Sequence, residues 1–182
     1  MAIVAGDILF KLSLKTGAAG NSAAQPDKNE SLGKYISTTQ ITDNSLNNLF
    51  DDITGDENAA SDVEYRCIFV HNNHATLAFE NVVAWLSAEV AGGASITIAI
   101  DDEVASPIAQ AAKQADEIAN ESTAPGAGVG AFSGPTSKAT GLSVGTIAAG
   151  YCRAIWVKRT AANTVAVDND GVTISVAGDT AA

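Results

Sequence analysis

Basic residues are scarce in this chain. Among its 182 residues, Lys and Arg number 10 and Asp and Glu number 21, which gives a formal net charge of −11. A surface of this sign repels phosphate backbones, so we expect no nucleic-acid partner. The charge suits a soluble protein, or one that docks on a basic partner.

Long apolar runs are also missing. No stretch reaches the roughly 20 residues that a membrane-spanning helix needs, so we expect no membrane partner. Residues 1–7 have neither the charged region nor the long apolar region of a secretory signal. We therefore expect a protein that is made and kept in the cytoplasm unless lysis releases it.

Aromatic residues and cysteines are few. Aromatics make up 5% of the chain, and much of the 46% hydrophobic content is alanine, which predicts a lean core of Val, Ile and Leu. Cys67 and Cys152 occupy matching places in a repeated pattern. Such a pair can bridge the two sheets of an immunoglobulin-like sandwich. Buried, reduced thiols are the interpretation that we favour for a cytoplasmic protein.

The repeated pattern is the main positive signal. Residues 63–70 are β-branched and aromatic, a polar turn follows at residues 71–74, and a second apolar run leads to Trp85. Residues 150–157 repeat the pattern and are followed by a polar turn and by residues 171–176. Each copy predicts a strand, a hydrophilic loop and a return strand, and we interpret the first copy as a hairpin.

The N-terminal part predicts a strand and a loop. Alternation over residues 3–15 places Leu12 on an apolar face and Lys11 and Ser13 mainly on the opposite, polar face. Residues 16–33 are rich in Gly, Ala, Asn and Ser and show no periodicity, which predicts a long exposed loop or a flexible arm.

The other segments are predicted as follows. Residues 45–53, capped by Asp43 or Asn44, predict a short helical turn, and residues 107–120 predict a short helix or an ordered loop. Exposed loops are predicted over residues 51–62 and 122–141, an outer segment over 164–167, and further strands over 34–42, 95–100 and 142–147.

Together these elements predict an all-β fold with about eight strands. We expect an antiparallel two-sheet β-sandwich, immunoglobulin-like or jelly-roll in type, with one or two short helices and an extended N-terminal strand or arm. We assign the strand and the flexible arm to residues 1–34 and a single sandwich domain to residues 35–182.

Candidate metal ligands are sparse. His71 and His74 flank a turn, but no third ligand is spaced near them, so we favour a metal-free turn. The run from Asp101 to Glu103 can offer carboxylate oxygens to Ca²⁺, but a solvated strand end explains it equally and is favoured. The segment 168–171 lacks the later acidic ligand of a calcium loop and fits a hairpin turn.

No catalytic constellation stands out either. The glycines of residues 126–130 neither follow a strand nor open a helix, and no carboxylate pair or Ser–His–acid set is selected. Trp85 and Trp156 can line a sugar groove, but a core or interface role is favoured. We therefore predict no enzyme activity and no catalytic, cofactor-binding or metal-binding residues.

One further observation concerns five short blocks of the sequence, which lie at residues 46–54, 57–67, 81–86, 145–159 and 170–174. Together they resemble the small structural proteins of tailed bacteriophages, over roughly residues 40–180 and without a catalytic signature. The segment 16–33 lies outside the resemblance.

The resemblance implies a non-enzymatic virion component, most of all a capsid decoration (cement) protein that binds the outer capsid surface and stabilises the head. The implied partners are the major capsid protein and further copies of this chain, as a dimer or trimer on the particle. In that role the N-terminal strand and residues 16–33 would reach a neighbouring subunit or the capsid shell, by strand addition at an exposed edge. The alternatives are a tail, neck or baseplate component, or a carbohydrate- or receptor-binding module.

Overall fold

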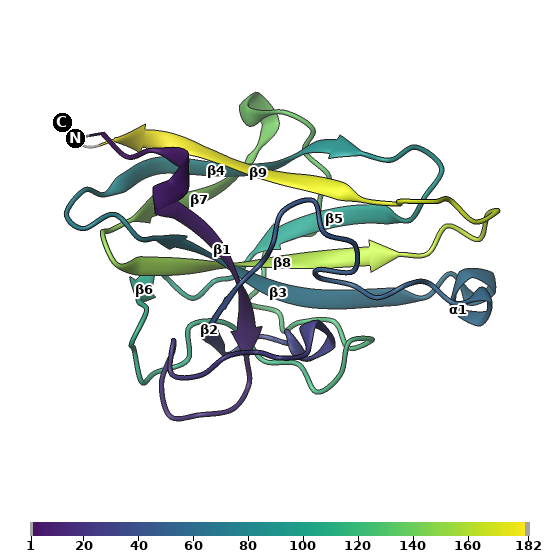
Figure 1. Cartoon of the computed structure of the whole chain (residues 1–182), viewed down its shortest axis with the longest axis horizontal. Helices are drawn as coiled ribbons and strands as arrows, with labels where there is room; N and C mark the ends of the chain where they lie inside the picture. Colours follow the sequence, from purple (N-terminus) through teal and green to yellow (C-terminus); the bar gives the residue numbers. More distant parts are fainter. Residues whose placement is uncertain (1, 181–182) are drawn as a thin grey trace.

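The computed structural model describes residues 2–180. Within this range nine strands are β1 (Ile8–Leu14), β2 (Tyr35–Gln40), β3 (Val63–Asn72), β4 (Phe79–Glu89), β5 (Ser95–Ile100), β6 (Ser106–Pro107), β7 (Leu142–Ile147), β8 (Tyr151–Thr160) and β9 (Val172–Thr180). They form two antiparallel sheets, which confirms the all-β sandwich (Figure 1). The larger sheet has the order β2-β1-β3-β8-β5, with β6 paired to β8, and the smaller sheet has the order β7-β4-β9.

Within residues 2–180, helical structure is limited to short segments of three to six residues. They are α1 (Gly55–Ala60) and the 3-10 turns η1 (Ala5–Asp7), η2 (Lys28–Glu30) and η3 (Lys138–Thr140). Among the described residues, no helix is long and apolar enough to cross a membrane.

The helical turn predicted over residues 45–53 is wrong. Asn44 and Asn47 have φ values of 55° and 54°, and single left-handed residues of this kind interrupt an α-helix. The helix α1 begins instead after Thr54, in the segment predicted as an acidic loop. The Thr54 hydroxyl accepts a hydrogen bond from the Glu57 N–H, and the Glu57 carboxylate accepts one from the Thr54 N–H. This capping box is a helix-start signal that the acidic composition concealed.

The predicted hairpin is also wrong, because β3 and β4 belong to different sheets, as do β8 and β9. Each copy of the repeated pattern is an arch that crosses from the larger to the smaller sheet. The buried Asn72 amide supports the first arch by donating hydrogen bonds of 2.9 Å to the carbonyls of Leu77 and Ile147. The two copies pair with each other, β3 with β8 and β4 with β9.

The larger sheet is covered on both faces. One face packs on the smaller sheet through an aliphatic core in which Ile68, Val70, Ile155 and Val157 are central. The other face carries a second core, which includes Phe69 and Trp156. Figure 1 shows the loops around residues 16–34 and 106–132 on that side of the molecule, so the fold has three layers: small sheet, large sheet and loops.

The N-terminal strand differs from its prediction in two ways. It begins at Ile8, after η1, and it lies between β2 and β3 as an inner strand of the larger sheet. Lys11 and Ser13, placed on a polar face by alternation, are buried beneath the loop layer. Alternation failed here because loops, which leave no periodic signal, cover the second face of the sheet.

The segment 16–33 forms part of this loop layer, although many of its side chains remain exposed. The Asn21 N–H donates to the Ile36 carbonyl, and the Thr38 N–H donates to the Ala23 carbonyl. The buried Gln25 amide donates to the carbonyls of Ser13 and Glu30. The segment is therefore bonded to strands on both sides of the proposed boundary at residue 34.

The segment 107–120 is an ordered loop, one of its two predicted alternatives. The buried Gln114 accepts a hydrogen bond from the Ile36 N–H and donates to the Pro107 carbonyl. Ala115 and Ile118 are buried in the second core. The segment thus takes its order from the sheet that it covers.

Candidate functional site

The two histidines do not form a joint site. His71 lies within β3 and is 2% exposed, so its prediction as part of a polar turn is wrong. His74 lies in the following loop, where its Nδ1 accepts hydrogen bonds from the Thr76 and Leu77 N–H groups. Among residues 2–180, no group of three or more His, Cys, Asp or Glu is arranged to hold a metal ion.

His71 has an unusual environment for a histidine. Neither ring nitrogen has a hydrogen-bond partner in the described part of the chain. Burial lowers the pKa of His71 to about 4, and the positive charge of Lys11 contributes to the shift. The imidazole is therefore neutral at physiological pH.

The two cysteines are free and buried, and both lie on the outer face of the larger sheet. Cys67 is opposite Trp156, whereas Cys152 is opposite His71, so the two cysteines are offset by four positions along β3. That spacing, about 13 Å along a strand, is too long for a disulfide. Burial raises the pKa of Cys152 to about 12, so this thiol is not a nucleophile at neutral pH.

The acidic run at the end of β5 is solvated only in part, because Asp102 is exposed whereas Asp101 is buried. Its Oδ2 accepts hydrogen bonds from Trp156 Nε1 at 2.8 Å and from the Asp116 N–H at 2.9 Å, and its Oδ1 accepts one from the Glu103 N–H at 2.9 Å. Burial raises the pKa of Asp101, and these hydrogen bonds oppose the shift. The carboxylate therefore joins β5, β8 and the loop layer.

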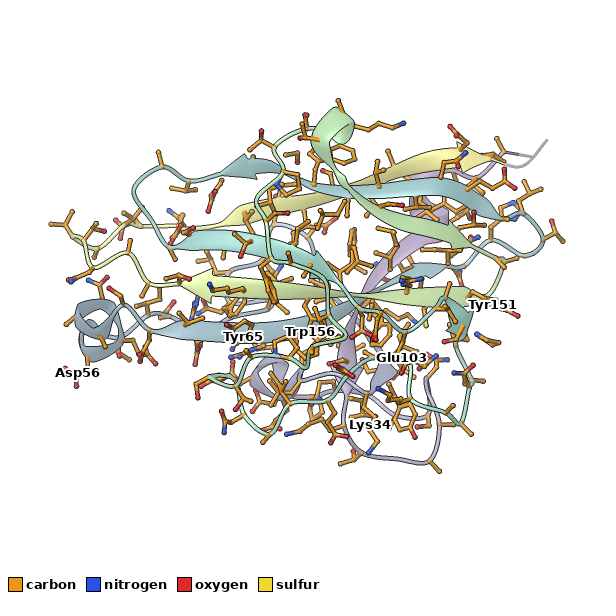
Figure 2. The ribbon with its side chains drawn as sticks, turned by 180° about the vertical axis from the view of Figure 1, so that it is seen from behind. Lys34, Asp56, Tyr65, Glu103, Tyr151 and Trp156 are labelled. Carbon is orange, nitrogen blue, oxygen red and sulfur yellow. The ribbon has the colours of Figure 1, made fainter. Side chains whose placement is uncertain are left out.

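The two tryptophans occupy different positions. Trp156 is fully buried beneath the loop layer, and Figure 2 shows it on the side of the sheet where Lys34 and Glu103 lie. It therefore has no surface for stacking on a sugar. Trp85 is half-buried in β4, on the face of the smaller sheet that points away from the core formed by Val82, Ala84 and Leu86.

The turn before β9 is not a hairpin turn, because it joins strands of different sheets. Asn169 has a φ of 55°, and Asp170 Oδ2 accepts a hydrogen bond of 2.6 Å from the Ala94 N–H. Asp170 thus has a structural partner in the loop before β5. The outer segment predicted over residues 164–167 is not a strand.

Arg66, the isolated basic residue of the middle region, belongs to a buried ion-pair cluster. Arg66 and Arg159 both pair with Glu64, and their guanidinium groups lie 5.1 Å and 4.7 Å from the centre of the Phe50 ring. Arg159 also pairs with Asp51, at 3.3 Å. Since these charges are paired within the fold, the cluster is structural and links one end of the larger sheet to the loop that carries Phe50 and Asp51.

Two shallow hollows on the described surface bring no reactive groups together. The larger, of about 290 Å³, is lined mainly by small and apolar residues such as Leu14, Ala23 and Pro26. Its charged residues, Lys15 and Glu30, form a salt bridge of 3.3 Å with each other.

The sheet edges are the features with free binding capacity. Loops cover both edges of the larger sheet: residues 21–25 bond to β2, and residues 130–133 bond to β5. In the smaller sheet, β4 lies between β7 and β9, so β7 and β9 are the two edge strands. β7 has six residues and is distorted at Gly145, where φ is +85°. β9 has nine residues and offers a longer open edge.

The composition of β9 leaves that edge unprotected. Exposed edge strands usually carry Lys, Pro or inward-pointing charges that prevent pairing with other chains. β9 has no Lys, Arg or Pro, and Asp179 is its one charged residue. The sequence of β9 contains a signal for this edge, namely a β-branched run with one charge. The interpretation of residues 168–171 as a hairpin turn concealed it, because a hairpin would pair β9 with β8.

Comparisons of the chain with protein-family models, with curated proteins and with solved structures found no match.

The hydrogen bonds of Asp101 predict a large effect of its removal. Asp101→Ala leaves the Trp156 indole and two backbone N–H groups without a partner in a buried place, which should lower the free energy of unfolding by roughly 3 kcal/mol. Urea denaturation followed by tryptophan fluorescence measures it. The control, Asp102→Ala, changes the exposed neighbour and should shift stability by less than about 0.5 kcal/mol. Equal effects of the two variants would contradict this role of Asp101.

His71 predicts a loss of stability in acid. Its pKa in the folded state, about 4, lies below the ordinary histidine pKa of 6.5, so the unfolded chain takes up a proton first as the pH falls. The contribution of the neutral His71 to the free energy of unfolding is therefore complete above pH 6.5. As the pH falls to about 4, the free energy of unfolding decreases by on the order of 3 kcal/mol. Urea midpoints at several pH values should fall less steeply in His71→Gln than in the parent. Parallel curves would refute the assignment.

Proposed function

We propose that this protein is a non-enzymatic structural component of a tailed-bacteriophage virion, and specifically a capsid decoration (cement) protein. It is made in the cytoplasm of the bacterial host, binds the outer surface of the capsid and stabilises the head. Its partners are the major capsid protein and other copies of this chain.

The open edge of β9 is the observation that carries this proposal. Strand addition at such an edge provides a row of main-chain hydrogen bonds without needing a deep pocket. A decoration protein makes many identical interfaces on one particle, and their stabilising effect adds up even when each is modest. A strand edge with a single charged residue, Asp179, suits this kind of repeated contact.

The location of the contact differs from the one first expected. Residues 16–33 were expected to reach a neighbouring subunit, but their backbone bonds to β2 and their side chains bond to β1 and β3. β9 takes the place of that segment as the binding element. The negative net charge, −11, favours a partner whose facing surface is basic.

A carbohydrate-binding or receptor-binding module on the virion is the second candidate. It rests on Trp85, which is half-buried on the outer face of the smaller sheet. Because Trp156 is fully buried, a change of tryptophan fluorescence on adding glycans would report on Trp85. Such a change, abolished in Trp85→Phe, would favour this candidate over the decoration protein.

Copy number separates head from tail. A decoration protein should be present in purified particles in a molar amount comparable with that of the major capsid protein, as measured by quantitative gel densitometry. A trace amount at one vertex would instead assign the chain to the tail, neck or baseplate.

The β9 edge is tested by charge. The pair Thr173→Lys and Ala177→Lys places two cations on the outer side of β9, which should weaken binding to capsids at least tenfold without unfolding the protein. The matched control, Thr38→Lys with Ser95→Lys, adds the same charge to exposed positions on β2 and β5, whose edges are covered. Sedimentation of each variant with undecorated capsids gives the bound fraction. Equal loss in both pairs would argue against the β9 edge.

A further inference from the structure

Lys11 is a buried lysine without a counter-ion. Lys15, Lys34 and Lys113 each pair with a carboxylate. Lys11, which is 8% exposed, has no such pair among the described residues. The Lys11 Nζ instead donates a hydrogen bond of 3.3 Å to the side-chain oxygen of Asn21.

The absence of a carboxylate makes this amine a potential nucleophile. Burial lowers the pKa of Lys11, because the charged ammonium loses its hydration without gaining an opposite charge. A larger fraction of the side chain is therefore the neutral amine, the form that attacks carbonyl carbons.

Asn21 is held in place as the electrophile. Its φ is 52°, and its backbone N–H donates a hydrogen bond of 2.6 Å to the Ile36 carbonyl. The preceding N–H, of Gly20, donates one of 2.9 Å to the Gln110 carbonyl. These two bonds fix the backbone at Asn21, and the hydrogen bond from Lys11 places the carboxamide beside the amine. Such proximity is the main requirement for an intramolecular reaction.

His71 offers a proton carrier at the same place. In the antiparallel pairing of β1 with β3, Leu9 is opposite His71 and Lys11 is opposite Phe69. Lys11 and His71 are therefore diagonal neighbours on one face of the sheet, a spacing that long side chains can bridge. Within residues 2–180 neither nitrogen of the neutral imidazole has a hydrogen-bond partner, so one can accept a proton and the ring can release it again.

We propose that Lys11 and Asn21 form a covalent amide cross-link inside the folded chain. The Lys11 Nζ attacks the Asn21 Cγ, the new Nζ–Cγ bond forms and the Cγ–Nδ2 bond breaks. His71 takes a proton from the attacking nitrogen and passes it to the departing Nδ2, which leaves as ammonia. Starting from the ammonium form of Lys11, the products are the amide and one ammonium ion, so no oxidant, reductant or co-reactant is needed.

The cross-link would fasten the loop layer to the sheet. It joins β1 to the segment 16–33, which covers the second core and protects the edge of β2. The proposal does not depend on the function proposed above.

Mass spectrometry of the purified full-length chain tests the cross-link. The folded protein should be lighter than its sequence mass by one ammonia, and trypsin should release residues 1–15 joined to residues 16–28, with no cleavage after Lys11. A chain that retains its full sequence mass after prolonged incubation in the folded state would overturn the proposal.

Variants separate the cross-link from other losses of ammonia. Lys11→Arg keeps the positive charge but removes the nucleophile, and Asn21→Ala removes the electrophile, so both should keep their full mass. Lys15→Arg, on the same segment, is the matched control and should lose ammonia as the parent does. An ammonia loss that persists in Lys11→Arg would indicate a succinimide at an asparagine and would also overturn the proposal.

The role of His71 is measured as a rate. After refolding from denaturant, His71→Gln should lose ammonia about 100-fold more slowly than the parent. Near-ultraviolet circular dichroism verifies that the variant is folded during the measurement. An unchanged rate in the folded variant would remove His71 from the proposed mechanism.

Discussion

The pairing of β3 with β8 is the constraint on which the other features of this fold depend. It runs without interruption from Val63 opposite Thr160 to His71 opposite Cys152. Both strands carry apolar side chains on both faces in their central parts, so this ladder must be covered twice. The smaller sheet covers one face, and loops cover the second face.

This double burial explains why the loops of the chain are structural. The segments 16–34 and 106–132 close the second core and also satisfy the edges of β2 and β5. It explains as well why polar groups are trapped beneath them. Asp101 accepts hydrogen bonds from three donors, whereas within residues 2–180 His71 has no hydrogen-bond partner and Lys11 has no carboxylate partner. The same loops do not reach the smaller sheet, where the edge of β9 remains open.

Local sequence signals were reliable where they depended on neighbouring residues. The strands β3, β5, β7 and β8 lie close to their predicted ranges, and both cysteines lie inside strands, free and buried. Signals failed where a distant segment decided the outcome. Alternation predicted that Lys11 faces solvent, but it is buried. Strand β4 was predicted to pair with β3 because the two are consecutive, but it pairs with β7 and β9. His71 looked like a turn residue because its polarity matched that of Asn72 and the residues that follow.

The class of fold followed from the sequence alone, since β-branched runs and their turns report on local backbone preference and on which residues must leave water. Strand pairing, the loop layer, the open edge of β9 and the meeting of Lys11 with Asn21 required the tertiary structure. Strands of similar propensity can pair in several ways, and the pairing that forms depends on how all the apolar faces are covered at once. No single segment contains that information.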